Sequence, residues 1–252
     1  MNTNQIITLV TGGNRGMGLE IVKELSQRGQ HVIMGARNLE KGRAAIDKLT
    51  KLNLDVDLVQ LDVTNSSSVT EAAQTVQQKY GYLTILINNA GAVFDARQDP
   101  SAVKLENLRD DFAINYFGLV DVSQKMLPLL QKSAHAKIIN ISSMMGSKTE
   151  ALNPQSSVYK AVAVGYQSAK AAANMYTVQL AKEMLRKNLS ITVNAIDTGM
   201  VATEFAGADP VQVKKMGGKT VKMGVARTIK LATDLGSKEI ATFSNTEGQV
   251  GW

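Results

Sequence analysis

The sequence predicts an α/β fold, in which one domain holds a doubly wound parallel sheet of about seven strands with helices on both faces. Apolar strand-like runs alternate with helical patterns along all 252 residues, which is typical of parallel strands joined by right-handed crossovers. Runs such as LTILI at 83–87 are almost entirely apolar, as strands covered on both faces require. Since no linker, repeat or low-complexity tract divides the chain, one domain is expected over residues 1–252.

Each predicted element follows from its own pattern of apolar residues. The strands are expected at 6–10, 31–36, 56–61, 83–87, 137–141, 191–196 and 241–244. The helices are expected at 17–27, 39–52, 66–79, 105–131, 166–187, 211–216 and 225–235. Asn38 should cap the second helix, serines should begin the third, and Pro128 should interrupt the fourth near its end. The irregular stretches 144–164 and 199–224 are long enough to suggest function.

Composition excludes several classes of protein. The chain has no cysteine, which excludes disulfides, thiolate catalysis and Cys-based zinc sites, and which fits a reducing cytoplasm. No apolar run approaches the ~20 residues that span a bilayer. The polar first five residues do not resemble a secretory signal peptide. We therefore expect a cytoplasmic protein with no membrane partner.

The net charge of +6 raises the possibility of a nucleic-acid partner. Lysines and arginines are scattered, however, and the nearest approach to a patch is Lys214, Lys215, Lys219 and Lys222. We interpret that cluster as a solvated or mobile surface, so no nucleic-acid partner is expected. His31 and His135 are interpreted as surface histidines, and no metal site is expected.

A glycine-rich turn follows the first predicted strand in ITLVTGGNRGMGLEIVKEL at 7–25. Gly12 and Gly13 allow backbone conformations that other residues avoid. Gly16 and Gly18 open the helix, where free N–H groups and the positive end of the helix dipole attract phosphate. The turn lies where sheets of this kind bind ligands, which favours a nucleotide site over a purely structural turn.

The spacing T-G-x-x-x-G-x-G at 11–18 is joined by further motifs along the chain. They are LDVTN with Asp62 and Val63, INNAG with Asn89, Ala90 and Gly91, NYFG with Asn115, IINISS with Ser143, and YQSAK with Tyr166 and Lys170. On these motifs, nearly the whole chain resembles the short-chain dehydrogenase/reductase family. TGGNRGMGLEIVKEL and the ending EGQVGW are similar to carbonyl-reductase-like members.

The resemblance implies a Rossmann-type fold that binds a nicotinamide dinucleotide. It implies a cofactor site formed by Gly12, Asn14, Arg15, Gly16, Met17, Gly18, Arg37, Asp62, Val63, Asn89, Ala90, Gly91, Tyr166, Lys170, Gly199, Val201 and Thr203. It implies four catalytic residues, which are Asn115, Ser143, Tyr166 and Lys170.

Two arginines indicate which dinucleotide is bound. A free ribose 2′-hydroxyl is usually held by a carboxylate at the end of the second strand, whereas a 2′-phosphate needs arginine. Arg37 stands where that acid would be, and Arg15 lies inside the glycine turn. Arginine suits phosphate through its charge and its planar donor fork. The sequence therefore predicts NADP(H), and surface arginines are the alternative.

Tyr166 and Lys170 are four residues apart, so they are neighbours on one helical face. We expect the ammonium to lower the pKa of the phenol, so that Tyr166 acts as acid or base on a substrate oxygen. The family resemblance implies that Ser143 holds that oxygen, that Lys170 also binds the nicotinamide ribose, and that Asn115 joins a proton relay. Ser142 is the rival for the serine role. Tyr159 is excluded because Ala163, not lysine, lies four residues beyond it.

The chain departs from the family pattern in two places. Thr198 stands where proline is common, and the stretch between Ser143 and Tyr166 is longer than usual. In carbonyl-reductase-like members such an insertion can cover the surface used for oligomerisation, so a monomer and a homo-oligomer both remain open. A lid over the substrate is expected at about 199–224. Val93, Phe94 and Phe205 are expected in the pocket, together with Met216 and Met223, although all five could instead be packing residues.

These features predict NADPH-dependent reduction of a ketone or aldehyde, reversible as alcohol oxidation. No charged residue can be placed against a substrate carboxylate or phosphate, which favours a fairly apolar carbonyl compound. One alternative is a reductase dedicated to a ketoacyl or sugar substrate. The other is a non-catalytic NADP-binding regulator, which would have no need of all four catalytic residues.

Overall fold

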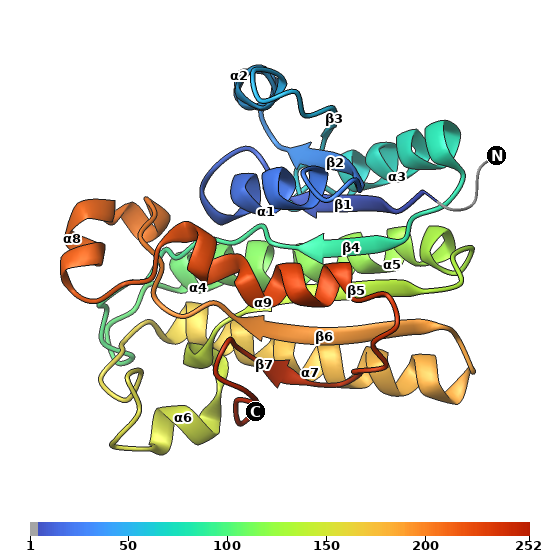
Figure 1. The fold of residues 1–252 in the computed structure, drawn as a ribbon. Coiled ribbons are helices and arrows are strands. Elements are labelled where there is room, and N and C mark those ends of the chain that lie inside the picture. Colours follow the sequence, from blue (N-terminus) through green and yellow to red (C-terminus); the bar gives the residue numbers. More distant parts are fainter. Residues whose placement is uncertain (1–4) are drawn as a thin grey trace.

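The computed structural model describes residues 5–252 and has one seven-stranded sheet in the order β3-β2-β1-β4-β5-β6-β7 (Figure 1). Neighbouring strands pair in parallel throughout. The strands are β1 (Ile7–Thr11), β2 (His31–Ala36), β3 (Val56–Gln60), β4 (Ile85–Asn88), β5 (Ala136–Ser142), β6 (Ile191–Asp197) and β7 (Phe243–Ser244). The predicted doubly wound α/β fold is thereby confirmed.

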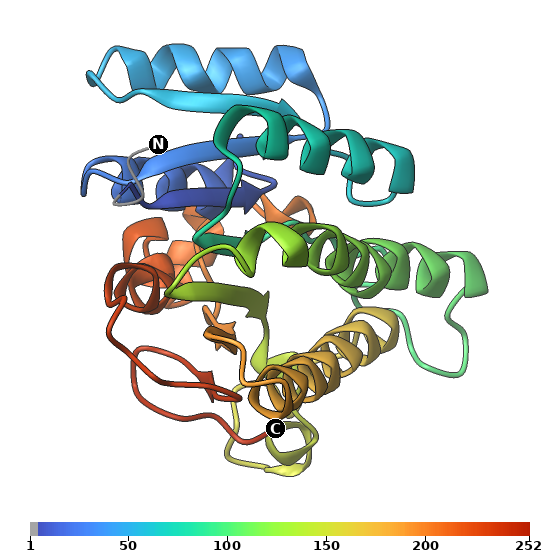
Figure 2. The same ribbon diagram turned by 90° about the vertical axis from the view of Figure 1, so that its right-hand side faces the viewer.

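Helices cover both faces of this sheet. They are α1 (Gly16–Ser26), α2 (Leu39–Thr50), α3 (Ser66–Tyr80), α4 (Leu105–Phe112), α5 (Leu119–Leu130), α6 (Lys148–Leu152), α7 (Val164–Arg186), α8 (Pro210–Lys215) and α9 (Val221–Thr233). Figure 2 shows α3, α5 and α7 on one side of the sheet and α1 and α9 on the other. The layers follow from the right-handed crossovers that parallel strands need.

The core has two halves, one on each face of the sheet. On one face, Val122 of α5 and Leu180 of α7 pack with the strands. On the other, Ile21 of α1 and Ile229 of α9 do so. Each such buried side chain contributes roughly 1.5–3 kcal/mol, so the apolar strands fix the sheet between its two helical layers.

The helix caps and breaks differ in detail from those expected. The Asn38 side chain accepts the Lys41 N–H at 2.8 Å, which confirms the predicted cap of α2. The third helix does begin at Ser66, but Asn65 is its cap, because its Oδ1 accepts the N–H groups of Ser67 and Ser68. Pro128 does not end the fourth predicted helix but lies in the last turn of α5.

The fourth predicted helix contains a change of winding that the sequence pattern did not reveal. Between α4 and α5 the chain forms the π-helical segment η1 (Ala113–Gly118). Such segments are rare and are frequently found at functional sites. Asn115 lies within η1.

The two irregular stretches lie beyond the carboxyl ends of the strands, on the left of Figure 1. The first contains the 3₁₀ turn η2 (Met144–Gly146) and α6. The second contains the 3₁₀ turn η3 (Phe205–Gly207) and α8. The carboxyl edge of the sheet therefore has long loops above it, as ligand-binding sheets of this type do.

The two histidines differ in environment. His135 is exposed, as expected. His31 is not a free surface residue, because its side chain is only 18% exposed and its Nε2 lies 2.6 Å from the carboxylate of Asp57. Separately, no helix within residues 5–252 is both long and apolar enough to cross a membrane.

Candidate active site

The turn between β1 and α1 requires glycine at several positions, because a larger side chain would not fit there. Gly12 and Gly16 have φ angles of +63° and +53°, which residues with a Cβ seldom adopt. A Cβ on Gly18 would lie 2.2 Å from the carbonyl oxygen of Gly12. Only glycine therefore lets the start of α1 approach the end of β1 this closely.

The N-terminus of α1 is suited to bind an anion. Arg15 is its N-cap residue but makes no capping hydrogen bond through its side chain, and the first turn has no acidic residue. The N–H groups of Gly16, Met17 and Gly18 have no carbonyl partner within the helix. Such groups bind phosphate together with the helix dipole. The residues present thus fit the pyrophosphate of a dinucleotide.

A side-chain amide directly after β4 fixes this turn. Asn89 Nδ2 donates to the carbonyl oxygens of Thr11 and Gly12, at 2.9 and 3.3 Å. The Thr11 hydroxyl oxygen in turn accepts the N–H groups of Asn89 and Ala90, both at 2.9 Å. The sequence analysis did not assign Thr11 a role, although its place directly before the glycines was a usable signal.

The two arginines predicted to read the 2′-phosphate both lie near this turn. Arg15 and Arg37 are exposed, and within residues 5–252 neither side chain forms an ion pair or hydrogen bond. Asp62, at the end of the next strand, accepts the backbone N–H of Thr64 at 3.0 Å and its hydroxyl at 2.7 Å. Val63 packs closely against Gly118, where a Cβ would meet it at 2.9 Å.

The segment after β6 returns to the glycine turn. The Thr203 side chain lies 3.7 Å from the position a Cβ would take on Gly16. Gly199 has a φ of +68°, and Val201 forms a parallel bridge with Lys219. Gly199, Val201 and Thr203 therefore belong to a loop that the fold brings over the predicted cofactor site. Asn14 and Met17, within the turn itself, are partly exposed.

Tyr166, Lys170 and Ser143 come together at the carboxyl end of β5. The Lys170 ammonium lies 5.7 Å from the centroid of the Tyr166 ring and donates to the Ile141 carbonyl at 2.7 Å. The Ser143 side chain lies close enough to the Tyr166 hydroxyl to oppose the rise in its pKa, and its Oγ accepts the Met145 N–H at 3.1 Å. Its rival Ser142 is buried and donates to Asn174 Oδ1 at 2.5 Å. The geometry thus favours Ser143 for contact with a substrate oxygen.

The pKa of Tyr166 moves opposite to our expectation. Burial is the main cause, and it raises the pKa well above that of free tyrosine; the hydrogen bond with Ser143 opposes it, and the charges of Asp197 and Asp111 add to it. Burial also lowers the pKa of Lys170 to about 8. The expected lowering of the phenol pKa by Lys170 is therefore wrong for this structure, because the ammonium points to the Ile141 carbonyl and burial dominates.

Asn115 explains the π-helical segment η1. Its Nδ2 donates to the Asp111 carbonyl at 2.9 Å and to the Ala92 carbonyl at 2.8 Å. In an α-helix the Asp111 carbonyl would accept the backbone N–H of Asn115. The side chain takes over that acceptor and ties the helix to the loop after β4. Its Oδ1 lies 3.0 Å from the position a Cβ would take on Gly91.

The five residues expected in the substrate pocket differ in how close they lie to Tyr166. The Phe205 ring meets the Tyr166 ring edge-on, with centroids 6.0 Å apart. Phe94 is 42% exposed and Val93 is partly exposed, and the described contacts do not join either side chain to Tyr166. Met216 and Met223 are 71% and 55% exposed. The structure thus brings only Phe205 of these five residues against the predicted acid.

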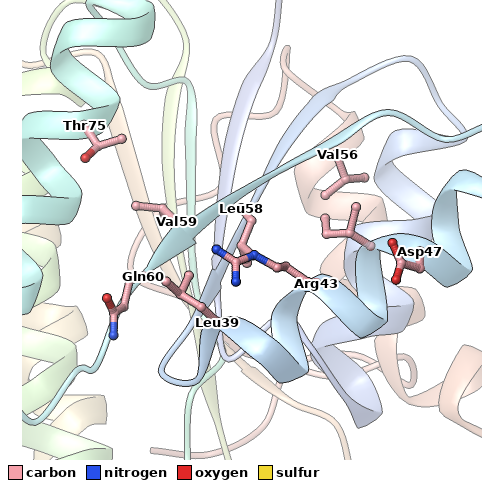
Figure 3. Close-up of a pocket in the computed structure, with 9 residues that line it drawn as sticks. Leu39, Arg43, Asp47, Val56, Leu58, Val59, Gln60 and Thr75 are labelled. Atoms are coloured by element: carbon pink, nitrogen blue, oxygen red, sulfur yellow. The ribbon is translucent and has the colours of Figure 1, made fainter.

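A groove of about 630 Å³ lies elsewhere, at the outer edge of the sheet (Figure 3). It runs between α2 and the edge strand β3, with Arg43 and Leu58 among its lining residues. None of the predicted site residues lines it. The groove is therefore separate from the chemistry at the carboxyl edge.

The comparison with known families agrees with this arrangement. Residues 6–212 match the family described as short chain dehydrogenase. The chain belongs to the short-chain dehydrogenase family. It is therefore an oxidoreductase of that family, and its motifs are found at the places where the fold forms the candidate site.

Two similar proteins and one similar solved structure illustrate the relationship. The short-chain dehydrogenase anuI of Penicillium roqueforti (strain FM164) is 30% identical over 256 residues, covering 98% of this chain and 97% of that protein. The carbonyl reductase [NADPH] 1 of Mus musculus is 33% identical over 147 residues, covering 58% and 51%. The solved structure of NADPH-bound carbonyl reductase from chicken fatty liver is 28% identical, with a TM-score of 0.84, and covers 98% and 100%.

Two buried carboxyl groups beside the site of this short-chain dehydrogenase were missed by the sequence analysis. Asp95 and Asp111 are both 0% exposed. Asp95 lies four residues after Gly91 in a loop without a recognised motif, and Asp111 is one of several acids on an amphipathic helix. No sequence signal marks them, because only the packing of α7 against α4 brings them together.

Proposed function

We propose that this short-chain dehydrogenase reduces a ketone or aldehyde with NADPH, with Tyr166 as the proton donor. The observation that supports this most directly is the meeting of Tyr166, Lys170 and Ser143 at the carboxyl end of β5. Burial raises the pKa of the Tyr166 hydroxyl, so the phenol is protonated throughout the neutral range and has a proton to give to a carbonyl oxygen. Ser143 lies beside the same hydroxyl, so a substrate oxygen placed between the two hydroxyl groups would receive two donors.

NADPH, when bound, supplies the hydride. The free N–H groups at the start of α1 would hold its pyrophosphate, with Asn89 fixing the turn around it. Lys170 would hold the nicotinamide ribose through its ammonium, and Asn115 would hold water in a relay that returns a proton to Tyr166. Asp62 and Val63 would lie against the adenine, and Ala90, Gly91, Gly199, Val201 and Thr203 would complete the site.

The preference for NADPH rests on charge. Arg15 and Arg37 are exposed and unpaired within residues 5–252, so both are available to a 2′-phosphate. A similar mouse protein is named for NADPH, and a similar chicken enzyme holds it. A carboxylate at position 37 would instead favour NAD(H).

The substrate is expected to be a largely apolar carbonyl compound. Phe205 presents its ring at the edge of Tyr166, and η3 and α8 of the predicted lid lie at the same edge of the sheet (Figure 1). Phe205 is 39% exposed, so a substrate could bury it as the loop closes.

Initial rates of NADPH oxidation test this proposal. A panel of activated ketones, quinones and aldehydes would be run with wild type, with Tyr166→Phe, and with Tyr159→Phe as a matched control. Tyr159 is 48% exposed, so that control should keep full activity. Tyr166→Phe should lose about 10²–10⁴-fold in kcat/KM. Tight NADPH binding without any turnover by wild type would favour a non-catalytic regulator instead.

A further inference from the structure

Two carboxyl groups outside the predicted catalytic set meet behind Tyr166. Asp95 comes from the loop after β4, and Asp111 from the last turn of α4. Both face the first turn of α7, where a Cβ on Gly165 would lie 2.8 Å from Asp111 Oδ2 and 3.2 Å from Asp95 Oδ2. Two ionised carboxylates this close and this buried would repel strongly, so their charge state needs an explanation.

Asp95 acts as a cap for the helix that carries Tyr166. Ala163, the N-cap residue of α7, makes no capping hydrogen bond. Instead Asp95 Oδ2 accepts the Gly165 N–H at 2.5 Å, and its Oδ1 accepts the Tyr166 N–H at 3.4 Å. Both oxygens are thus acceptors at the positive end of a helix, which suits a carboxylate rather than a carboxylic acid.

Asp111 has one satisfied oxygen and one unsatisfied oxygen. Its Oδ1 accepts the Phe94 N–H at 3.1 Å. Its Oδ2 is buried and has no hydrogen-bond partner among residues 5–252. A buried polar atom without a partner is costly. A proton on this oxygen would give it a partner, because the Asp95 carboxylate lies within hydrogen-bonding reach.

The charges around Asp111 favour that proton. Burial raises the pKa of Asp111 to about 7; the hydrogen bond from Phe94 opposes this, and the charges of Asp95 and Asp110 add to it. From α7 the neutral hydroxyl of Tyr166 faces it. No cation forms an ion pair with Asp111 in the part of the chain that the structure describes.

We propose that Asp95 and Asp111 share one proton and that the resulting hydrogen bond is a positioning clamp for Tyr166 and Asn115. This rests on the function proposed above, because it concerns the geometry of that same site. The clamp holds the start of α7 against the turn of α4 whose carbonyl is bonded by Asn115. When the shared proton is lost at higher pH, two buried negative charges push these elements apart and activity falls.

A change in charge would also reach Tyr166 directly. The negative form of Asp111 raises the pKa of the Tyr166 hydroxyl. The shared proton therefore keeps one negative charge away from the predicted acid. Asp95 and Asp111 touch neither cofactor nor substrate in this scheme and act only through the residues that they position.

Asp111→Asn tests the shared proton, because it keeps the size and hydrogen bonds of the side chain but removes its ability to ionise. Its amide can still donate to Asp95 and its oxygen can still accept from Phe94, but it cannot ionise. Asp110→Asn is the matched control, because it removes the same charge from the adjacent, exposed position. Between about pH 6 and about pH 9, kcat/KM should fall in wild type and in Asp110→Asn. The fall in these two proteins should be ~tenfold or more greater than any fall in Asp111→Asn. Equal profiles for all three proteins would overturn the clamp.

An infrared titration tests the pair without any turnover. The carbonyl-stretch band of a protonated carboxylic acid should persist in wild type and Asp110→Asn above the range in which ordinary carboxyls titrate. It should be lost in Asp111→Asn, and in Asp95→Asn it should disappear at lower pH than in wild type, because a neighbouring charge is removed while Asp111 stays buried. Absence of the band in wild type overturns the inference. If wild type reduces no carbonyl compound, the proposed function fails, and the band still decides whether the proton is shared.

Discussion

The Lys170 ammonium lies beside the Tyr166 ring, 5.7 Å from its centroid, and is fixed there by a 2.7 Å hydrogen bond to the Ile141 carbonyl. The two residues are one turn apart on α7, and both are buried. Burial acts on them in opposite directions, because it disfavours the charged form of each. It raises the pKa of Tyr166 and lowers that of Lys170 to about 8.

Lys170→Met should remove activity without destabilising the fold. Methionine keeps the length of the side chain but has no charge to bind the ribose or to support proton return to Tyr166. We expect kcat/KM for NADPH-dependent reduction to fall by about 10²–10⁴-fold. The thermal midpoint should stay the same or rise, because a buried charge is replaced by an apolar group.

The control for this prediction is Lys182→Met, which removes an exposed lysine from the same helix. Its kinetics should match wild type within about twofold. An active Lys170→Met enzyme would contradict the role given to the ammonium. A variant that is inactive and also much less stable would point to a structural role instead.

The raised pKa of Tyr166 predicts a direction for the reaction. The raised pKa makes the phenol a weaker acid, but at neutral pH it keeps the protonated form that reduction needs, whereas the ionised form that oxidation needs is scarce. Carbonyl reduction should therefore dominate at neutral pH. The rate of alcohol oxidation relative to reduction should rise up to about tenfold per pH unit, because oxidation needs the ionised form. Initial rates in both directions, in the same series of buffers, check this, and a ratio that falls with pH would refute it.

Features that depend on neighbouring residues along the chain could be read from the sequence. The apolar strand Ile7–Thr11, the glycine turn after it and the cap at Asn38 each follow from a few adjacent residues. Tyr166 and Lys170 were paired correctly because helical spacing fixes their separation. Periodicity alone predicts a doubly wound fold but does not distinguish between several forms of it. The family motifs identify which form this chain adopts.

Features that depend on contacts between distant segments could not be read in this way. The π-helical turn forms because Asn115 bonds the Ala92 carbonyl, 23 residues earlier. Ser142, the rival of the serine that the family resemblance implies, is held by Asn174 from 32 residues away. The direction of the Tyr166 shift was wrong because it is set by burial, which the spacing of charged residues does not reveal.

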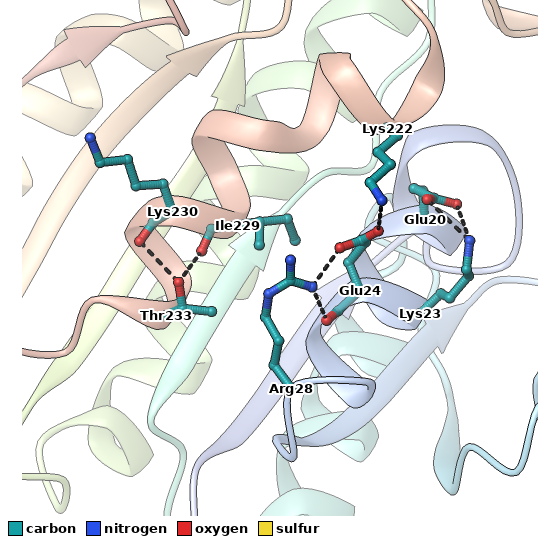
Figure 4. A network of polar contacts seen from close by, with 8 residues as sticks. All are labelled: Glu20, Lys23, Glu24, Arg28, Lys222, Ile229, Lys230 and Thr233. Atoms are coloured by element: carbon teal, nitrogen blue, oxygen red, sulfur yellow. Dashed lines mark hydrogen bonds and ion pairs between the residues drawn. The ribbon is translucent and has the colours of Figure 1, made fainter.

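An ion pair with a buried carboxylate joins α1 to α9, whose first residues lie in the predicted lid (Figure 4). The Glu24 side chain is 7% exposed and lies 2.5 Å from Arg28 Nη1 and 3.5 Å from Lys222 Nζ of α9. Glu24→Gln should lower the free energy of unfolding by about 0.5–1 kcal/mol, because glutamine has no charge to pair with Arg28 and Lys222, whose side chains are 44% and 76% exposed. Chemical denaturation at neutral pH measures this.

The control here is Glu20→Gln, which breaks the pair with Lys23 on the same helix and whose carboxylate is more exposed than that of Glu24, 18% against 7%. It should cost less than about 0.5 kcal/mol. For Glu24, burial raises the pKa, but Arg28 and Lys222 lower it further, so that the net shift is downward. The stability it contributes is therefore present above the ordinary glutamate pKa of about 4.3 and is lost as the pH falls below it. A difference between wild type and Glu24→Gln that did not shrink in acid would contradict this account.

Arg37→Asp tests the choice of cofactor. Arginine would meet the 2′-phosphate of NADPH with a charge-assisted hydrogen bond, whereas aspartate would repel the phosphate and could accept the 2′-hydroxyl of NADH. We expect the Kd for NADPH to rise about 10- to 150-fold while the Kd for NADH changes by less than about threefold. Arg43→Asp on α2 is the matched control, because it makes the same change of net charge in the groove away from the site. Equal losses for both cofactors in Arg37→Asp, or equal effects of the two substitutions, would mean that net charge alone acts and that Arg37 does not hold the phosphate.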